Sequence, residues 1–236
     1  MSDSILAVIT PNRGIWFRKI TADHPVGSVW NSIGGRVDQI DAADGKVVVR
    51  TDSTVLYRGG ITTQKWEGTN WQVFGAEPMI YVAVGDGKIM GIEEDFDVVA
   101  RAGITALNPH GSSWTPIGGQ LKQISIGDGK IVGINEIGEV YYRSGIDDNN
   151  PHGTGWELLS GARLMQIDVG DGRIVGVDAT RRVWYRWGIT ASQPFGRGWK
   201  VTVGNFTHVS IGNGIIAGVD GGKEPLFCDS KTFPKY

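Results

Sequence analysis

The sequence predicts an all-β protein, a six-bladed β-propeller built from four-stranded antiparallel blades. A tryptophan recurs at intervals of 41, 43, 42 and 43 residues, at Trp30, Trp71, Trp114, Trp156 and Trp199. Each interval holds the same succession of short apolar runs and turns, and none has convincing helical spacing. Glycine accounts for 36 of 236 residues, which fits many tight turns. Four strands in about 42 residues is the module of a propeller blade.

The repeat over residues 120–161 shows its four strands most clearly. Residues 121–126 alternate apolar and polar side chains, which predicts a first strand. Asp128-Gly129 predicts a hairpin turn before a second strand at 131–135, and another turn follows. Residues 140–143, Val-Tyr-Tyr-Arg, are strong β-formers and predict a third strand. A longer loop over 144–155 leads to a fourth strand at Trp156.

These elements recur along the chain. First strands are expected to begin near Val37, Met79, Leu121, Leu164 and Phe206, and second strands near Leu6, Val47, Ile89, Ile131, Ile174 and Ile215. Third strands are expected at 15–18, 55–58, 98–101, 140–143, 183–186 and 226–228, and the tryptophan segments supply the fourth. The first repeat has no clear first strand, and the last has only residues 231–236 as a poor candidate for its fourth.

The repeats define a single expected propeller domain over residues 1–236. Their approximate bounds are 1–35, 36–76, 77–119, 120–161, 162–204 and 205–236. Because the chain starts and ends inside a repeat, we expect the ring to be closed by joining of the chain ends. An open solenoid is the alternative, but solenoids need polar end caps and neither end resembles one.

Composition narrows the class of protein. The net charge is −2, which favours neither nucleic acid nor an anionic membrane as a partner. No apolar run approaches the roughly 18 residues that membrane insertion requires. The N-terminus lacks the features of a signal peptide. The single cysteine, Cys228, excludes an intrachain disulfide. We therefore expect a cytoplasmic protein.

The written-out repeat resembles the tectonin-type β-propeller lectins. The phrases that carry the resemblance are Gln-Ile-Ser-Ile-Gly at 123–127, Ile-Val-Gly-Ile-Asn at 131–135, Val-Tyr-Tyr-Arg at 140–143 and the closing Gly155-Trp156. Full or partial copies cover the whole chain. Without a signal peptide, the chain is most similar to the fungal cytoplasmic members. That resemblance implies a defence lectin for bacterial or nematode surface glycans, particularly O-methylated sugars such as mannose or fucose.

Recurring side chains near the ends of the third strands are the candidate ligand-binding residues. An arginine ends five of these strands, and its planar guanidinium can bind two adjacent sugar hydroxyls. Aromatic residues lie beside the arginines, and two of the long loops contain Asn-Pro-His-Gly. The alternatives are inter-blade ion pairs or hydrogen bonds to loop carbonyls for the arginines, core packing for the aromatics and simple turns for the loops. The candidates are Trp16, Arg18, Tyr57, Arg58, Arg101, Asn108, His110, Tyr142, Arg143, Asn150, His152, Tyr185 and Arg186.

Neither a cofactor nor a catalytic group is expected. Asp44, Asp86, Asp128 and Asp171 each precede a glycine in a hairpin turn, where aspartate is the ordinary residue, so we do not interpret them as metal ligands. No EF-hand spacing, catalytic triad signature or phosphate-binding glycine loop is present.

We therefore expect a multivalent lectin, which oligomerisation would reinforce. The alternative is a protein-interaction scaffold without sugar binding; an enzyme would require a unique acid and nucleophile, and we find none.

Overall fold

The computed structural model describes residues 4–20, 27, 29–52, 54–62, 64–65, 67–75, 77–190, 192–194, 196–202, 204–212, 214–220 and 225–229. All regular elements in these ranges are β-strands. The chain divides into two compact units, residues 1–120 and 121–236. Residues 21–26 and 230–236 lie outside the described part, and the second of these ranges includes the candidate last strand at 231–236.

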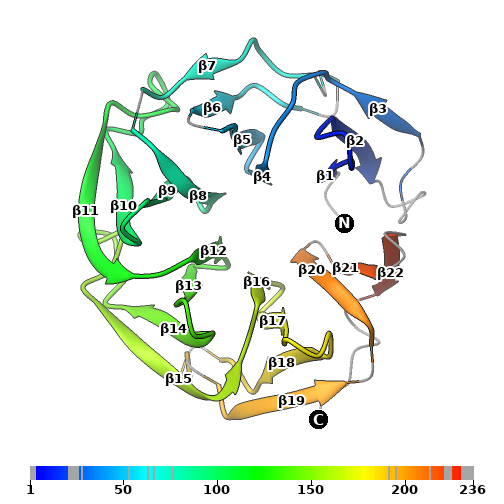
Figure 1. Ribbon diagram of the computed structural model, residues 1–236. Coiled ribbons are helices and arrows are strands. Elements are labelled where there is room, and N and C mark those ends of the chain that lie inside the picture. Colours follow the sequence, from blue (N-terminus) through cyan, green and yellow to red (C-terminus); the bar gives the residue numbers. More distant parts are fainter. Residues whose placement is uncertain are drawn as a thin grey trace. The chain divides into compact units, whose positions relative to one another are not determined.

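The first unit contains three antiparallel sheets (Figure 1). The first is three-stranded, with β1 (Ser4–Ile9), β2 (Ile15–Ile20) and β3 (Trp30–Ser32). The second comprises β4 (Gln39–Ala43), β5 (Lys46–Arg50), β6 (Val55–Arg58) and β7 (Gln72–Val73). The third comprises β8 (Met79–Gly85), β9 (Lys88–Glu93), β10 (Asp97–Ala102) and β11 (Ser113–Gln120). Every strand pairs with its neighbours in sequence, which is the meander of a propeller blade.

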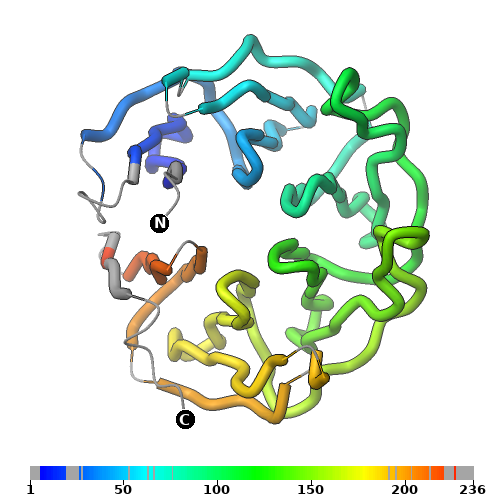
Figure 2. The backbone as a smooth tube through the Cα atoms, turned by 180° about the vertical axis from the view of Figure 1, so that it is seen from behind, coloured from blue at the N-terminus to red at the C-terminus, as the bar shows by residue number. Residues whose placement is uncertain are grey.

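The second unit repeats this pattern. One sheet comprises β12 (Gln123–Gly127), β13 (Lys130–Ile134), β14 (Glu139–Ser144) and β15 (Gly155–Arg163). The next comprises β16 (Gln166–Gly170), β17 (Arg173–Val177), β18 (Val183–Trp187) and β19 (Gly198–Thr202). The last has three strands, β20 (Phe206–Gly212), β21 (Ile215–Asp220) and β22 (Pro225–Asp229). Figure 2 follows the same hairpins from behind.

The prediction of six four-stranded blades in a ring closed by joining of the chain ends is wrong. Only four sheets have four strands, and the two terminal sheets have three each in the described residues. No described sheet combines strands from both ends of the chain. The spacing of the tryptophans predicts the number of repeats, but not whether every strand of a repeat is paired. Closure of the ring also requires backbone pairing between the terminal segments. The propeller therefore falls short of the predicted six complete blades.

The Asp-Gly turns form as predicted and lie at the same end of the blade as the long loops. Asp44 and Gly45 both have positive φ, at 53° and 68°, as do the corresponding residues of the other Asp-Gly turns. This backbone suits a two-residue hairpin. The amide of Ile61, in the loop after β6, donates a hydrogen bond to the carbonyl of Gly45 at 3.1 Å. The long loop after β6 is therefore anchored on the turn.

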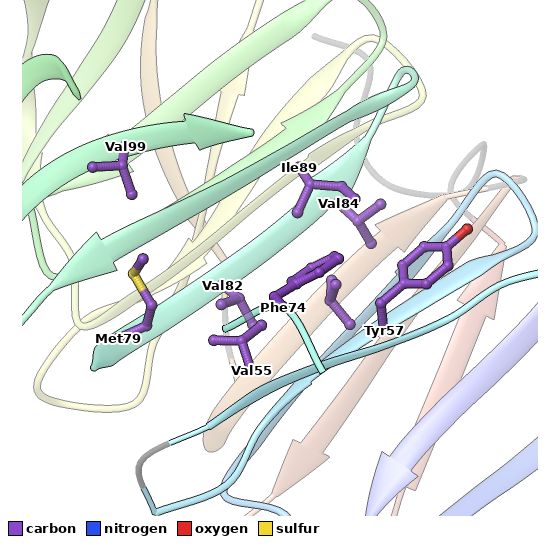
Figure 3. Close-up of a cluster of buried hydrophobic side chains, with 9 residues drawn as sticks. Val55, Tyr57, Phe74, Met79, Val82, Val84, Ile89 and Val99 are labelled. Atoms are coloured by element: carbon purple, nitrogen blue, oxygen red, sulfur yellow. The ribbon is translucent and has the colours of Figure 1, made fainter. Parts of the chain in front are cut away.

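The core lies between successive sheets rather than within any one of them. Between β4–β7 and β8–β11, the buried cluster includes Val55, Tyr57, Phe74, Val82 and Ile89 (Figure 3). A second cluster packs β12–β15 against β16–β19, and a third packs β16–β19 against β20–β22. Within each unit, neighbouring blades thus bury their apolar faces against each other.

Glutamines at the first strands add polar bonds between the sheets. The amide of Gln39 pairs with the backbone of Val82, with bonds of 2.8 and 3.0 Å. Gln123 makes the same two bonds with Ile167, and Gln166 makes them with Val209. These side chains satisfy backbone groups that would otherwise be buried without partners. The repeated glutamine is therefore part of the scaffold.

Candidate functional site

The five candidate arginines cover the five recurring tryptophans. Arg18, Arg101, Arg143 and Arg186 lie opposite Trp30, Trp114, Trp156 and Trp199 in neighbouring strands. Each guanidinium carbon lies over the indole, 5.0 to 5.4 Å from its centroid, and Arg58 does the same over Trp71 at 5.3 Å. This geometry is a cation–π contact. The arginine and tryptophan of one repeat therefore form one unit.

Two of these arginines also hold their own loops. The Nε of Arg101 donates to the carbonyl of His110 at 2.9 Å, and the Nε of Arg143 donates to the carbonyl of His152 at 2.8 Å. Arg101 and Arg143 are 6% and 4% exposed. Burial lowers the pKa of both guanidinium groups below its usual value. Arg101 and Arg143 therefore have a structural role in holding their loops, in addition to any contact with a ligand.

A cluster of rings lies between β4–β7 and β8–β11. We call it the first junction and define it as Tyr57, Phe74, Arg101, His110 and Trp114. Tyr57 stacks on Phe74, with centroids 5.6 Å apart, and His110 contacts both rings edge-on at 5.9 and 6.4 Å. Trp114 meets Phe74 edge-on, and Arg101 lies 4.7 Å from the Phe74 centroid. Apolar surface, a phenol, an imidazole and a guanidinium thus come together here.

A related cluster lies between β12–β15 and β16–β19. This second junction consists of Tyr142, Leu159, Arg186 and Trp199. Tyr142 and Leu159 are buried in the shared core, against which Trp199 packs. The Nε1 of Trp199 donates to the carbonyl of Leu159 at 3.4 Å. Burial raises the pKa of the Tyr142 phenol, as it does for Tyr57, so both hydroxyls stay protonated donors near neutral pH.

The Asn-Pro-His-Gly loops have a conformation that other repeats reach with different residues. The carbonyl of Asn108 accepts hydrogen bonds from the amides of Thr105 and Gly111, and Asn150 accepts the equivalent pair. Lys65 and Gln193 accept the same pair in their own loops. The backbone geometry therefore does not require asparagine. Asn150 is exposed, while Asn108, His110 and His152 are half-buried.

The remaining candidates lie apart from these junctions. Tyr185 occupies the tyrosine position in β18 and packs toward β20–β22. Trp16 aligns with Trp184 rather than with the tyrosines, because Phe17 precedes Arg18 at the tyrosine position. Trp16 and Arg18 are half-buried. The structure thus assembles Tyr57, Arg101 and His110 in one place and Tyr142 and Arg186 in another.

Sequence reasoning missed Phe74 and Leu159. Each follows a recurring tryptophan by three residues, at Trp71 and Trp156, and so a signal was present in the repeat. It also treated Asp44 and Asp171 as turn residues alone. Their carboxylates accept hydrogen bonds from the amides of Gly87 and Gly214 in the next turn of the same unit, at 2.7 and 2.6 Å.

The described residues show neither a metal-binding cluster nor a membrane-spanning helix. No group of three or more histidine, cysteine, aspartate or glutamate side chains in the described ranges is arranged to hold a metal ion. The described part of the chain also contains no helix with the length and apolar character that a membrane crossing requires.

The comparisons with solved structures concern the fold. Human WBSCR16 matches 97% of this chain over 74% of its own, with a TM-score of 0.61 and 12% identity. Prp20p from Saccharomyces cerevisiae matches 97% over 70%, with a TM-score of 0.63 and 12% identity. The ectodomain of the Arabidopsis thaliana receptor kinase ACR4 matches 97% over 77%, with a TM-score of 0.53 and 14% identity. At such identities the likeness extends to the fold alone.

The family comparison is more specific. No curated protein matches the chain significantly. Residues 73–165 match the model of the Tectonin domain, and this segment includes the sheets β8–β11 and β12–β15. The match agrees with the repeated phrases of the sequence and with the meander topology of the sheets. Residues 73–165 are therefore similar to the Tectonin domain, within a chain that has the fold of a β-propeller.

Proposed function

We propose that this chain is a lectin with several similar glycan sites at the junctions between blades. Tectonin propellers are in general not enzymes, and the fold suits either a lectin or an interaction scaffold. The observation that carries the proposal is the first junction, where Arg101 lies against the rings of Phe74 and Trp114, and Phe74 also contacts Tyr57 and His110. Sugar recognition uses such a mixture, because aromatic rings pack on C–H faces while polar groups bind hydroxyls.

The same composition supports O-methylated sugars as the ligand class. A methyl ether needs a small apolar contact beside hydrogen-bond donors. Phe74 and Trp114 supply apolar surface in the first junction, and Leu159 and Trp199 supply it in the second. Tyr57 and Tyr142 add a protonated hydroxyl to each. Methylated mannose or fucose on bacterial or nematode surfaces would thus be the target, and defence the role.

Repetition favours avidity over single-site strength. Two junctions with corresponding tyrosine, arginine and tryptophan residues lie on one chain. Shallow sugar sites bind weakly, and linked sites raise the apparent affinity for a surface that displays many copies of the ligand. A homo-oligomer would extend this effect.

A glycan array that includes methylated and unmethylated mannose and fucose tests the proposal. We expect binding to the methylated forms; silence across the array would overturn the proposal. Tyr142→Phe keeps the ring but removes the hydroxyl, and should weaken binding about threefold to tenfold if that hydroxyl contacts sugar. Tyr141→Phe is the matched control, because the Tyr141 hydroxyl donates to Glu139 instead. Equal affinities for the two variants would exclude the second junction.

An interaction scaffold is the second candidate. Exposed aliphatic side chains follow the tryptophans by two residues on three outer strands: Val73, Leu158 and Val201, at 65%, 52% and 46% exposure. Such side chains could contact a protein partner. A silent array, together with loss of a partner after Leu158→Ser, would favour this function.

A further inference from the structure

The repeat over residues 162–204 departs from the others at three neighbouring positions. The amide of Arg197 donates to the carbonyl of Trp187 at 2.8 Å, and the same bond joins the corresponding residues of three other repeats. These loops can therefore be aligned residue by residue. The position of Trp187 holds Gly59, Ala102 or Ser144 elsewhere, that of Arg197 holds Thr69, Ser112 or Thr154, and that of Lys200 holds Gln72, Thr115 or Glu157.

The three substituted residues lie together. Trp187 is half-buried, the guanidinium carbon of Arg197 lies 5.7 Å from its ring centroid, and the Nζ of Lys200 lies 4.9 Å from it. Gly188, at φ 72°, leaves room for the stem of Arg197, since a Cβ there would overlap it. Both cations thus lie beside the same indole, and the Nε of Arg197 also donates to the Oε1 of Gln193 at 3.3 Å.

The charge of this repeat is unlike that of the chain as a whole. Residues 162–204 contain seven basic and three acidic residues, whereas residues 77–119 contain two basic and six acidic residues. The three carboxylates of the basic repeat have partners elsewhere. Asp168 accepts from Ser125 and Ser210, Asp171 accepts from Gly214, and Asp178 binds Arg182. The excess of basic residues in this repeat is therefore a local feature that the net charge of −2 conceals.

This cluster is separate from the second junction. In a strand, successive side chains point to opposite faces of the sheet. Lys200 follows Trp199, and Trp187 follows Arg186, so the pair Trp187 and Lys200 lies on the other face of the sheet β16–β19. A ligand at this cluster need not compete with one at the junction.

We propose that Trp187, Arg197 and Lys200 form a second kind of site, which binds a negatively charged sugar, a uronate or a sulfate ester. A guanidinium binds two oxyanion oxygens side by side, an ammonium adds a third contact, and an indole offers apolar surface to a sugar ring. The choice of a sugar rests on the proposed lectin function. Nucleic acid is less suited, because its binding uses a track of cations and several stacking rings, whereas this cluster has one ring.

The test compares a sulfated oligosaccharide and an oligogalacturonate with neutral oligosaccharides of equal length, at about 0.15 M salt. Wild-type protein should bind the charged probes and not the neutral ones. Arg197→Thr with Lys200→Gln installs residues that other repeats carry at these positions, so the loop backbone is retained. We expect this double variant to lose at least about tenfold in affinity. Trp187→Ser should also weaken binding, because the ring positions both cations.

Arg173→Gln is the matched control, since it removes a charge from the Asp-Gly turn of the same repeat. Unchanged affinity in the double variant, or an equal loss in the control, would overturn the proposal. Equally tight binding of single-stranded DNA of similar length would also overturn it, in favour of general polyanion binding. Methylated-sugar binding by the same double variant should be unchanged. If wild-type protein binds the charged probes but not methylated sugars, that result would count against the junctions and not against this cluster.

Discussion

At the scale of single residues, the recurring arginine combines two tasks that its sequence position alone could not separate. Its guanidinium covers the tryptophan of the neighbouring strand, and in Arg101 and Arg143 its Nε holds the carbonyl of a loop histidine. The loop is the element that carries Asn108 or Asn150. The arginine therefore orders the candidate binding loop, in addition to any direct contact with sugar.

Replacement of Arg143 tests this structural task. Arg143→Ala removes two bonds to loop carbonyls, from His152 and Gly153, and the contact with Trp156. We expect the free energy of unfolding, measured by urea denaturation, to fall by about 2–4 kcal/mol. Arg163→Ala is the control, because Arg163 is 63% exposed and its ion pair with Glu139 spans 3.5 Å, so its loss should cost less than about 0.5 kcal/mol. Unchanged stability together with lost glycan binding would assign Arg143 to ligand contact alone.

The residue scale also shows where sequence reasoning ended. The third-strand pattern placed Tyr57 and Arg101 correctly in their strands, because apolar alternation reports on local structure. The pattern could not predict the contact between Tyr57 and His110, since the two residues belong to different repeats and meet only when the sheets pack. Trp187, Arg197 and Lys200 break the pattern of the repeat, but the sequence analysis did not identify this break, and the proximity of the three residues depends on the pairing of β18 with β19.

At the scale of elements, polar bonds between first strands define how one blade follows the next. Gln166 closes two hydrogen bonds with Val209, and Asp168 accepts from both Ser210 and the amide of Ile211. The sequence displayed the repeated Gln-Ile phrase but gave no reason for it. The reason is that β16 and β20 do not pair as strands, so side chains must satisfy the facing backbone groups.

Gln166→Ala measures the strength of this link. The substitution leaves the amide and carbonyl of the buried Val209 without their partner, which should cost about 1–3 kcal/mol for each group that stays unsatisfied. Hydrogen exchange at the amide of Val209 should accelerate accordingly. Gln72→Ala provides the control. Because Gln72 is exposed on β7, its replacement should leave the free energy of unfolding and the hydrogen exchange of Val209 unchanged. Protection of Val209 equal to that of wild type would show that the bond adds nothing to the packing of β20.

At the scale of the whole molecule, near-identical repeats carry unequal chemistry. The period of the tryptophans predicted the strands and the Asp-Gly turns well, because each repeat encodes them locally. It predicted six complete blades and a closed ring wrongly, because the terminal segments had to supply pairing that the described strands do not show. The period also gave no sign of the charge difference between residues 77–119 and 162–204, and the net charge of the whole chain averages over both repeats.

The number of sugars bound per chain is the whole-molecule measure of the proposed lectin. Two junctions share a tyrosine, an aliphatic or aromatic neighbour, and an arginine over a tryptophan. Titration calorimetry with a methylated monosaccharide should therefore give a stoichiometry of at least two. His110→Ala removes a ring from the first junction only, and should reduce the stoichiometry by one while the remaining affinity stays unchanged. A wild-type stoichiometry of one, or an affinity loss shared by all sites in this variant, would show that the junctions do not act as separate equivalent sites.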